Sequence, residues 1–258
     1  MSSRRGSVVS VSCNDVYSFT KPVRDEIVLV AGFGVEGDVH AGVRVRHRSR
    51  VKADPTQPNL RQVHLMQAEL FGEVGEKGYA VTPGDLGENV TTSGIDLLAL
   101  PLGTILRFGP PAGETAGPGA EAHTRPAAGG GATARRSEGP AIAAEPATAV
   151  RAVLAAASAA VLDESTTKAA AAVATAAARE TGDDPRPAVV IAGLRNPCAQ
   201  INGFQQGLLK EVVGHDENGS LVRKAGIMAV VLRGGHIRAG DHVHVEFPPP
   251  PHAPLERV

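Results

Sequence analysis

The sequence predicts a mainly β protein whose strands form a closed or nearly closed sheet. Short apolar runs recur along most of the 258-residue chain, and turns rich in Gly, Pro and Asp separate them. Helical patterns are few, and strands do not alternate with helices as a doubly wound sheet requires. Hydrophobic residues make up 42% of the chain, which suffices for one substantial core. We therefore expect a single domain over residues 1–258.

The apolar runs place the expected strands in order along the chain. They cover residues 7–12, 27–31, 61–66, 87–92, 103–108, 189–191, 227–232 and 242–247. The run 27–31 is apolar throughout, so we expect both of its faces to be covered. Short helices are expected at 67–74 and, as one amphipathic helix, within 199–213. The basic run 44–52 is expected to be a solvated loop, with a phosphate clamp as the alternative.

A glycine motif follows the second expected strand. Residues 32–37 read G-x-G-x-x-G, which in a dinucleotide-binding fold opens a helix facing a pyrophosphate. The residues after Gly37 lack an apolar stripe at helical spacing, and no second βαβ unit follows. We therefore expect these glycines to form turns.

Composition and charge argue against several partners. The formal net charge is -1, so no global field attracts nucleic acid or acidic membrane, and aromatic residues for base stacking are few. No apolar stretch resembles a signal peptide or a spanning helix. The two cysteines, Cys13 and Cys198, do not make a disulfide framework, which favours a reducing compartment. We expect a cytoplasmic protein that binds neither nucleic acid nor membrane.

The composition changes abruptly in the middle of the chain. Residues 110–186 are rich in Ala, Gly, Pro, Thr and Glu, which indicates a low-complexity insertion between two strands. We expect its first part, to residue 146, to be disordered and the rest to form an Ala-rich surface or partly formed helix without chemistry. Residues 248–258 are expected to be a Pro-rich extended tail.

Cys198 is the strongest candidate for a functional residue. The expected strand 189–191 is broken by Gly193, and Asn196 with Pro197 marks a turn, so Cys198 lies on a loop. A guanidinium such as that of Arg195 favours the thiolate form. A thiolate attacks electrophiles, carries sulfur and binds soft metals. An inert buried cysteine is the alternative, and it is the interpretation we favour for Cys13.

Several segments resemble a known family. Residues 193–201, Gly-Leu-Arg-Asn-Pro-Cys-Ala-Gln-Ile, resemble the cysteine motif of the MOSC domain, named for the C-terminal domain of molybdenum cofactor sulfurase. Residues 34–40, 62–64 and 83–92 are similar to segments of free-standing bacterial-type members. The resemblance implies a MOSC-type β-barrel whose loops gather over one mouth, where Cys198, Asn89 and His40 would meet.

The resemblance also implies a cofactor and roles for site residues. Cys198 would bind the metal of a molybdenum cofactor (molybdopterin), and Glu36 or His40 would move protons. The residues that would hold the cofactor are Arg195, Asn196, Asn89, Thr91, Thr92, Arg44 and Arg46. Pyridoxal phosphate is associated with the family through a fused desulfurase, but no lysine here is placed to form a Schiff base. His64 is expected to be structural.

Three functions follow from these implications. The leading one is a molybdenum-dependent reductase of N-hydroxylated compounds, with a small-molecule substrate and an electron-donor protein. The second is a sulfur carrier in which a Cys198 persulfide receives sulfur from a cysteine desulfurase. The third is a non-catalytic binding module. A homodimer is compatible with each.

Overall fold

The structure is a computed structural model that describes residues 5–109, 146–215, 219 and 221–258. The stretch expected to be disordered, 110–146, therefore lies outside the described residues, except for Pro146. None of the helices in the described ranges combines the length and the apolar character needed to cross a bilayer.

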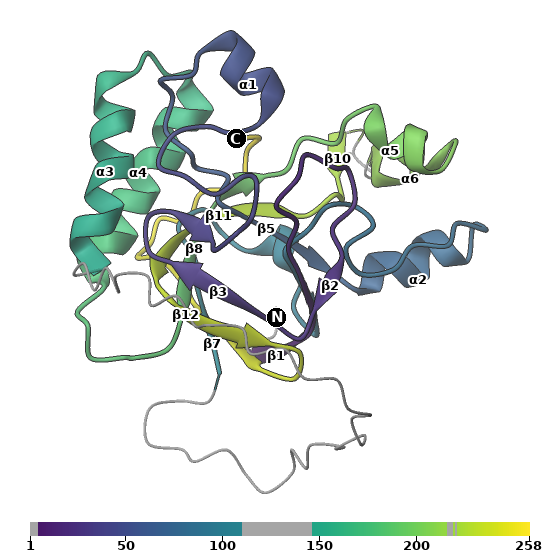
Figure 1. Ribbon diagram of the computed structural model, residues 1–258, viewed down its shortest axis with the longest axis horizontal. Coiled ribbons are helices and arrows are strands. Elements are labelled where there is room, and N and C mark those ends of the chain that lie inside the picture. Colours follow the sequence, from purple (N-terminus) through teal and green to yellow (C-terminus); the bar gives the residue numbers. More distant parts are fainter. Residues whose placement is uncertain (1–4, 110–145, 216–218, 220) are drawn as a thin grey trace, which may run out of the picture.

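Seven of the described strands close into a barrel, which confirms the predicted fold class (Figure 1). Their order is β13-β7-β8-β11-β5-β6-β1, and β1 pairs with β13 to complete the ring. All pairs are antiparallel except β5 with β6. The strands are β1 (Arg5–Ser12), β5 (Val63–Gln67), β6 (Val90–Ser93), β7 (Ile105–Phe108), β8 (Ala188–Leu194), β11 (Ile227–Arg233) and β13 (His242–Glu246). Closure leaves no free edge among these strands.

The barrel core follows from side-chain alternation. Val189 and Ile191 of β8 lie inside the barrel with Ile227 and Ala229 of β11, and Phe108 is fully buried beside them. The same alternation places Val190 of β8 and Val230 of β11 on the outer surface of the barrel, where they are also buried.

A small second sheet flanks the barrel. It consists of β12 (Gly235–Arg238), β3 (Glu26–Val30) and β4 (Gly34–Val35), while β2 (Val23–Arg24) pairs with β1. The expectation that 27–31 is covered on both faces is wrong, because only Ile27 and Leu29 are buried and Val30 is exposed. No helix follows β4, and the glycines of 32–37 have positive φ, so they form turns as predicted.

Short helices surround one end of the barrel. They are α1 (Arg48–Ala53), α2 (Glu69–Gly75), α5 (Gln200–Phe204) and α6 (Leu208–Val212), with η1 (Leu97–Ala99) and the hairpin β9 (Val213–His215) and β10 (Leu221–Arg223) nearby. Two expectations are corrected here. The basic run 44–52 was expected to be a loop throughout, but its last residues form part of α1. The single helix expected within 199–213 is two helices, because Gly207 between them has a φ of 91°.

The insertion forms two helices instead of one surface helix. They are α3 (Pro146–Ala159) and α4 (Glu164–Arg179), which pack over β11 and β8 (Figure 1). Val153 of α3 and Val173 of α4 are fully buried against Val190 and Val230 on the outside of the barrel. The apolar stripe of the insertion is weak, but it folds because it meets a second apolar surface.

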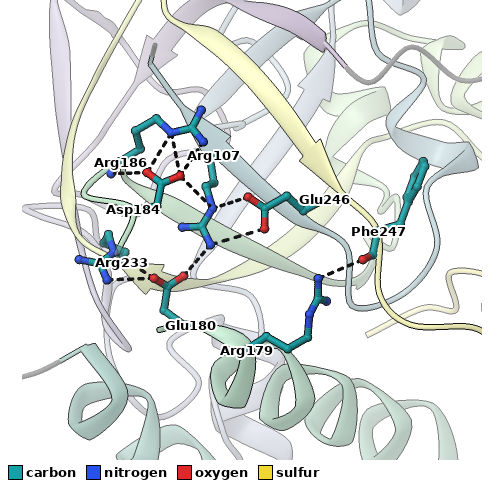
Figure 2. Close-up of polar contacts among 8 residues, drawn as sticks. All are labelled: Arg107, Arg179, Glu180, Asp184, Arg186, Arg233, Glu246 and Phe247. Carbon is teal, nitrogen blue, oxygen red and sulfur yellow. Dashed lines mark hydrogen bonds and ion pairs between the residues drawn. The ribbon is translucent and has the colours of Figure 1, made fainter. Parts of the chain in front are cut away.

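The end of α4 is tied to the barrel by ion pairs (Figure 2). Glu180, directly after α4, contacts Arg107 of β7 at 3.0 Å and Arg233 of β11 at 2.9 Å. Arg107 also pairs with Glu246 of β13 and with Asp184. The insertion is thus an integral layer of the domain.

The Pro-rich segment 248–258 is extended but packed. The amide of Leu194 at the end of β8 donates to the carbonyl of Glu256 (2.7 Å), and that of Leu102 donates to Ala253 (2.9 Å). Val258 is only 4% exposed. The segment therefore extends the barrel wall beside β8.

Candidate functional site

A cavity of about 720 Å³ lies at the barrel end where β8 finishes and β5, β6 and β11 begin. Five residues predicted from the sequence line it, namely Cys198, His40, Asn89, Arg195 and Asn196. Basic side chains form much of the remaining wall, namely Lys21, His47, Arg48, Arg50, Arg61, His64 and Arg257. No Asp or Glu of the described chain is among the lining residues.

Cys198 stands four residues after β8, on the loop that leads into α5. Its thiol is partly buried and donates to Oε1 of Gln200 at 3.4 Å. The loop is anchored at its start, because the amide of Arg195 donates to the carbonyl of Gly226 at 3.0 Å. Cys198 is therefore held at the cavity by a fixed strand end and remains within reach of solvent.

Arg195 brings a buried positive charge to the site. Burial lowers the pKa of Arg195, while its attraction to Cys198 and Glu88 opposes that change. Its Nη1 is buried and has no hydrogen-bond partner in the described structure. Such a donor is costly to leave unsatisfied, so it marks a place where an acceptor is needed.

Arg61 is a second buried guanidinium with an unpartnered nitrogen. Burial lowers its pKa to about 10, and repulsion from Arg50, Arg195 and Arg257 contributes to the change. Its Nε is also buried without a partner in the described structure. The cavity therefore concentrates guanidinium groups with no Asp or Glu of the described chain among its lining residues, which favours an anionic ligand.

Beside the cavity, the carboxylate of Asp38 is buried among Lys21, Asn89 and His40. Asp38 Oδ2 lies 2.6 Å from Lys21 Nζ and accepts from Asn89 Nδ2 at 2.8 Å. Asp38 Oδ1 lies 3.3 Å from Nδ1 of His40 and accepts from its amide at 2.9 Å. Burial alone would raise the pKa of Asp38, but the hydrogen bond from His40 and the charge of Lys21 hold it well below its ordinary value. An ionised carboxylate thus orients His40 at the cavity wall.

Two further histidines are kept neutral. The rings of His40 and His47 stack with centroids 4.3 Å apart, and burial together with the charge of Arg61 lowers the pKa of His47 to about 2. His64 Nε2 lies 2.7 Å from the carbonyl oxygen of Ala225, and burial holds the pKa of His64 well below its usual value. His64 thus has the backbone-holding contact expected for it.

Five sequence-predicted residues lie outside the cavity lining. Glu36 is exposed, and its carbonyl faces the Cys13 thiol at 3.6 Å. Thr91 donates to Glu88 at 3.2 Å and Thr92 to the carbonyl of Met66 at 3.4 Å, so both hydroxyls are used inside the fold. Arg44 and Arg46 are exposed and line a separate hollow.

Sequence reasoning missed several lining residues. Arg61 directly precedes the 62–64 motif, and Arg50 belongs to the basic run, so both had a local signal. Lys21 and Arg257 had none, because only the folded chain brings them to the cavity.

The fold can be compared with solved structures. The YuaD protein from Bacillus subtilis is similar to this chain with a TM-score of 0.56 and 18% sequence identity, covering 96% of this chain and 100% of YuaD. The two proteins share a fold. YiiM from Escherichia coli and YiiM from Geobacillus stearothermophilus match with 14% identity and a TM-score of 0.46, covering 96% and 93% of this chain and 73% and 75% of theirs. No family model and no curated protein matches the sequence.

Proposed function

We propose that the cavity binds an anionic molybdenum pterin cofactor beside Cys198 and that the protein reduces N-hydroxylated small molecules. The observation that carries the proposal is the cavity itself. A thiol lies on a wall with five guanidinium groups, and two of these have buried, unpartnered nitrogens. The motifs around Cys198 and in 83–92 resemble MOSC domains, and the closed barrel agrees with that resemblance.

The residues present fit such a cofactor. Arg61 and Arg195 would donate to its phosphate, since Nε and Nη1 of these residues need acceptors. Cys198 would be a metal ligand, because thiolate suits a soft metal already bound by sulfur. Among the described residues no three His, Cys, Asp or Glu side chains form a cluster that could hold a metal ion. A metal would therefore enter with ligands of its own.

The chain would contribute proton transfer. When bound, the cofactor would pass electrons to the substrate, and a separate electron-donor protein would reduce the cofactor. Reduction of an N–OH group to N–H consumes two electrons and two protons and releases one water molecule. His40, oriented by Asp38, is the proton-transfer residue of the proposal. Glu36, the other candidate, is exposed and does not line the cavity.

The test is expression in a host that makes the cofactor, followed by molybdenum quantification. We expect stoichiometric molybdenum and turnover of an N-hydroxylated base by wild type and by the matched control Cys13→Ser. Cys198→Ser should contain at least tenfold less molybdenum than wild type, because its hydroxyl is a poor ligand for a soft metal. Wild-type protein without molybdenum from such a host would contradict the proposal.

Sulfur transfer is the second candidate, favoured by the partial exposure of Cys198 on a loop. The Cys198 thiolate would attack the outer sulfur of a desulfurase persulfide, releasing the desulfurase thiolate and leaving a persulfide on Cys198. Intact mass measurement after incubation with a cysteine desulfurase and cysteine would then show one added sulfur that a reductant removes. Absence of both molybdenum and this persulfide would favour a non-catalytic binding module.

A further inference from the structure

The C-terminal segment lies against the strand that carries Cys198. It runs parallel to the end of β8, with Arg257 opposite Leu194, and the amide of Val258 donates to Leu194 at 3.3 Å. The approach is close, since a Cβ on Gly193 would lie 2.5 Å from the carbonyl oxygen of Glu256. Val258 is buried among residues of α3 and α4. The backbone on both sides of Arg257 is therefore fixed.

The insertion holds this segment from the outside. Ser165 in the first turn of α4 donates to the carbonyl of Arg257 at 2.9 Å, and Lys168 pairs with Glu256 at 3.0 Å. The other end of α4 is fixed as well, because Arg179 donates to the carbonyl of Phe247 at 3.0 Å and Glu180 pairs with Arg107 (Figure 2). Helix α4 is thus attached to the barrel at both ends.

Arg257 joins other guanidinium groups at the rim of the cavity. Arg257 and Arg50 of α1 both line the cavity and both repel the charge of Arg61. In the described structure none of these three side chains has an ion pair with a carboxylate, and Nε of Arg61 is buried without a partner. Asp163 attracts Arg50 from beyond ion-pair distance, but repulsion among the three guanidinium groups, strongest at the buried Arg61, still favours binding of an anion between them.

We infer that Arg257, Arg50 and Arg61 form a subsite for a phosphoryl group, and that α4 keeps Arg257 in place through the C-terminal segment. Planar guanidinium groups donate paired N–H bonds to phosphate oxygens, and the charge of three of them more than offsets that of a phosphate dianion. The insertion, to which the sequence assigned no chemistry, becomes a positioning element of the site.

A phosphoryl group can come from two sources, a cofactor and a phosphorylated substrate. The subsite shares Arg61 with the proposed cofactor site and so deepens the proposed function, and molybdenum content separates the two sources. If Arg257→Ala loses molybdenum together with phosphate affinity, the cofactor supplies the group. If it keeps molybdenum and loses affinity for a phosphorylated N-hydroxy compound, the substrate supplies it.

The test is isothermal titration calorimetry of the full chain, purified without cofactor, with inorganic pyrophosphate as the probe. Arg257→Ala should weaken binding about tenfold, the loss expected for one charge-assisted contact, and Arg257→Lys should recover part of it. The double variant Ser165→Ala/Lys168→Ala should weaken binding severalfold, although neither residue lines the cavity.

Matched controls separate binding from folding. Arg24→Ala removes an exposed guanidinium away from the cavity, and Thr175→Ala removes a hydroxyl of α4 that bonds only within its helix. Both should bind pyrophosphate as wild type does, and circular dichroism should show all variants folded. The subsite would be overturned if wild type did not bind pyrophosphate, or if the pyrophosphate affinity of Arg257→Ala were within twofold of that of wild type. Unchanged binding by the double variant would overturn the role of α4.

Discussion

Two groups of arginines in this protein have opposite surroundings. Around Arg107 the guanidinium groups face carboxylates, and Glu180 alone forms ion pairs with two of them (Figure 2). Around Arg61 and Arg195 no carboxylate lines the cavity in the described chain. The first group joins the insertion to the barrel, and we propose that the second binds an anion. Arginine count alone cannot distinguish these uses, whereas the position of the carboxylates can.

The largest expected effect is the fall in the free energy of unfolding when Arg107 and its ion pairs are removed. Arg107→Ala should lower the free energy of unfolding by about 3 kcal/mol, because Glu180 is 4% exposed at its side chain and would lose a buried partner. Urea denaturation measures the change. Arg238→Ala is the control, since the Arg238 side chain in its pair with Glu26 is 63% exposed and its loss should cost much less than that of Arg107. Equal costs for the two variants would remove the distinction between buried and exposed pairs.

Acidification should lower the free energy of unfolding, because His47 is buried in its neutral form. Burial lowers the folded-state pKa of His47 to about 2, so between pH 6.5 and that value the unfolded chain binds a proton that the folded chain does not. The free energy of unfolding should therefore fall, on the order of 1 kcal/mol per pH unit, from pH 6.5 to 5. His47→Gln should reduce this slope in urea titrations and leave the part that comes from His64, whose pKa is also held below its usual value, whereas the exposed-residue control His252→Gln should leave the slope unchanged. An unchanged slope in His47→Gln would show that His47 accepts a proton in the fold.

Removal of a cavity arginine should act in the opposite direction to removal of Arg107. Arg61→Met should leave stability unchanged or raise it by about 1 kcal/mol, because a buried charge without a partner is replaced by an apolar side chain. Added pyrophosphate should stabilise wild type by about 2.7 kcal/mol at a hundred times its Kd, and should stabilise the variant much less. Thermal melts with and without the anion measure both. A loss as large as that of Arg107→Ala would mean that Arg61 is structural.

The two cysteines should differ by a smaller, kinetic effect. Cys198 lies in the cationic cavity and should react severalfold faster with iodoacetate relative to iodoacetamide than Cys13 does, because the field attracts the anionic reagent. Burial and the charge of Asp38 raise the pKa of Cys13, which slows its reaction with both reagents. Peptide mass spectrometry quantifies each adduct, and 1 M salt should reduce the preference. Equal ratios at both cysteines in low salt would contradict a positive cavity.

The barrel strands were predictable because each depends on a local alternation of side chains. The covering role of the insertion was also partly encoded, in the continuous apolar runs 189–192 and 227–232, where both faces of β8 and β11 need cover. The weak stripe of α3 and α4 did not reveal that they supply this cover, because helix burial depends on the partner surface. In the site, Cys198 and Asn89 had motif signals, whereas Lys21 did not.

The sequence by itself determined a mainly β chain, turns at the glycines of 32–37, and a loop cysteine following a strand. These follow from properties of neighbouring residues, namely alternation, turn preference and charge beside a thiol. Only the tertiary structure decided which arginines are neutralised, and that Arg257 reaches the same cavity as Arg61. Electrostatic balance depends on distances between residues far apart in the chain, so no local pattern could contain it.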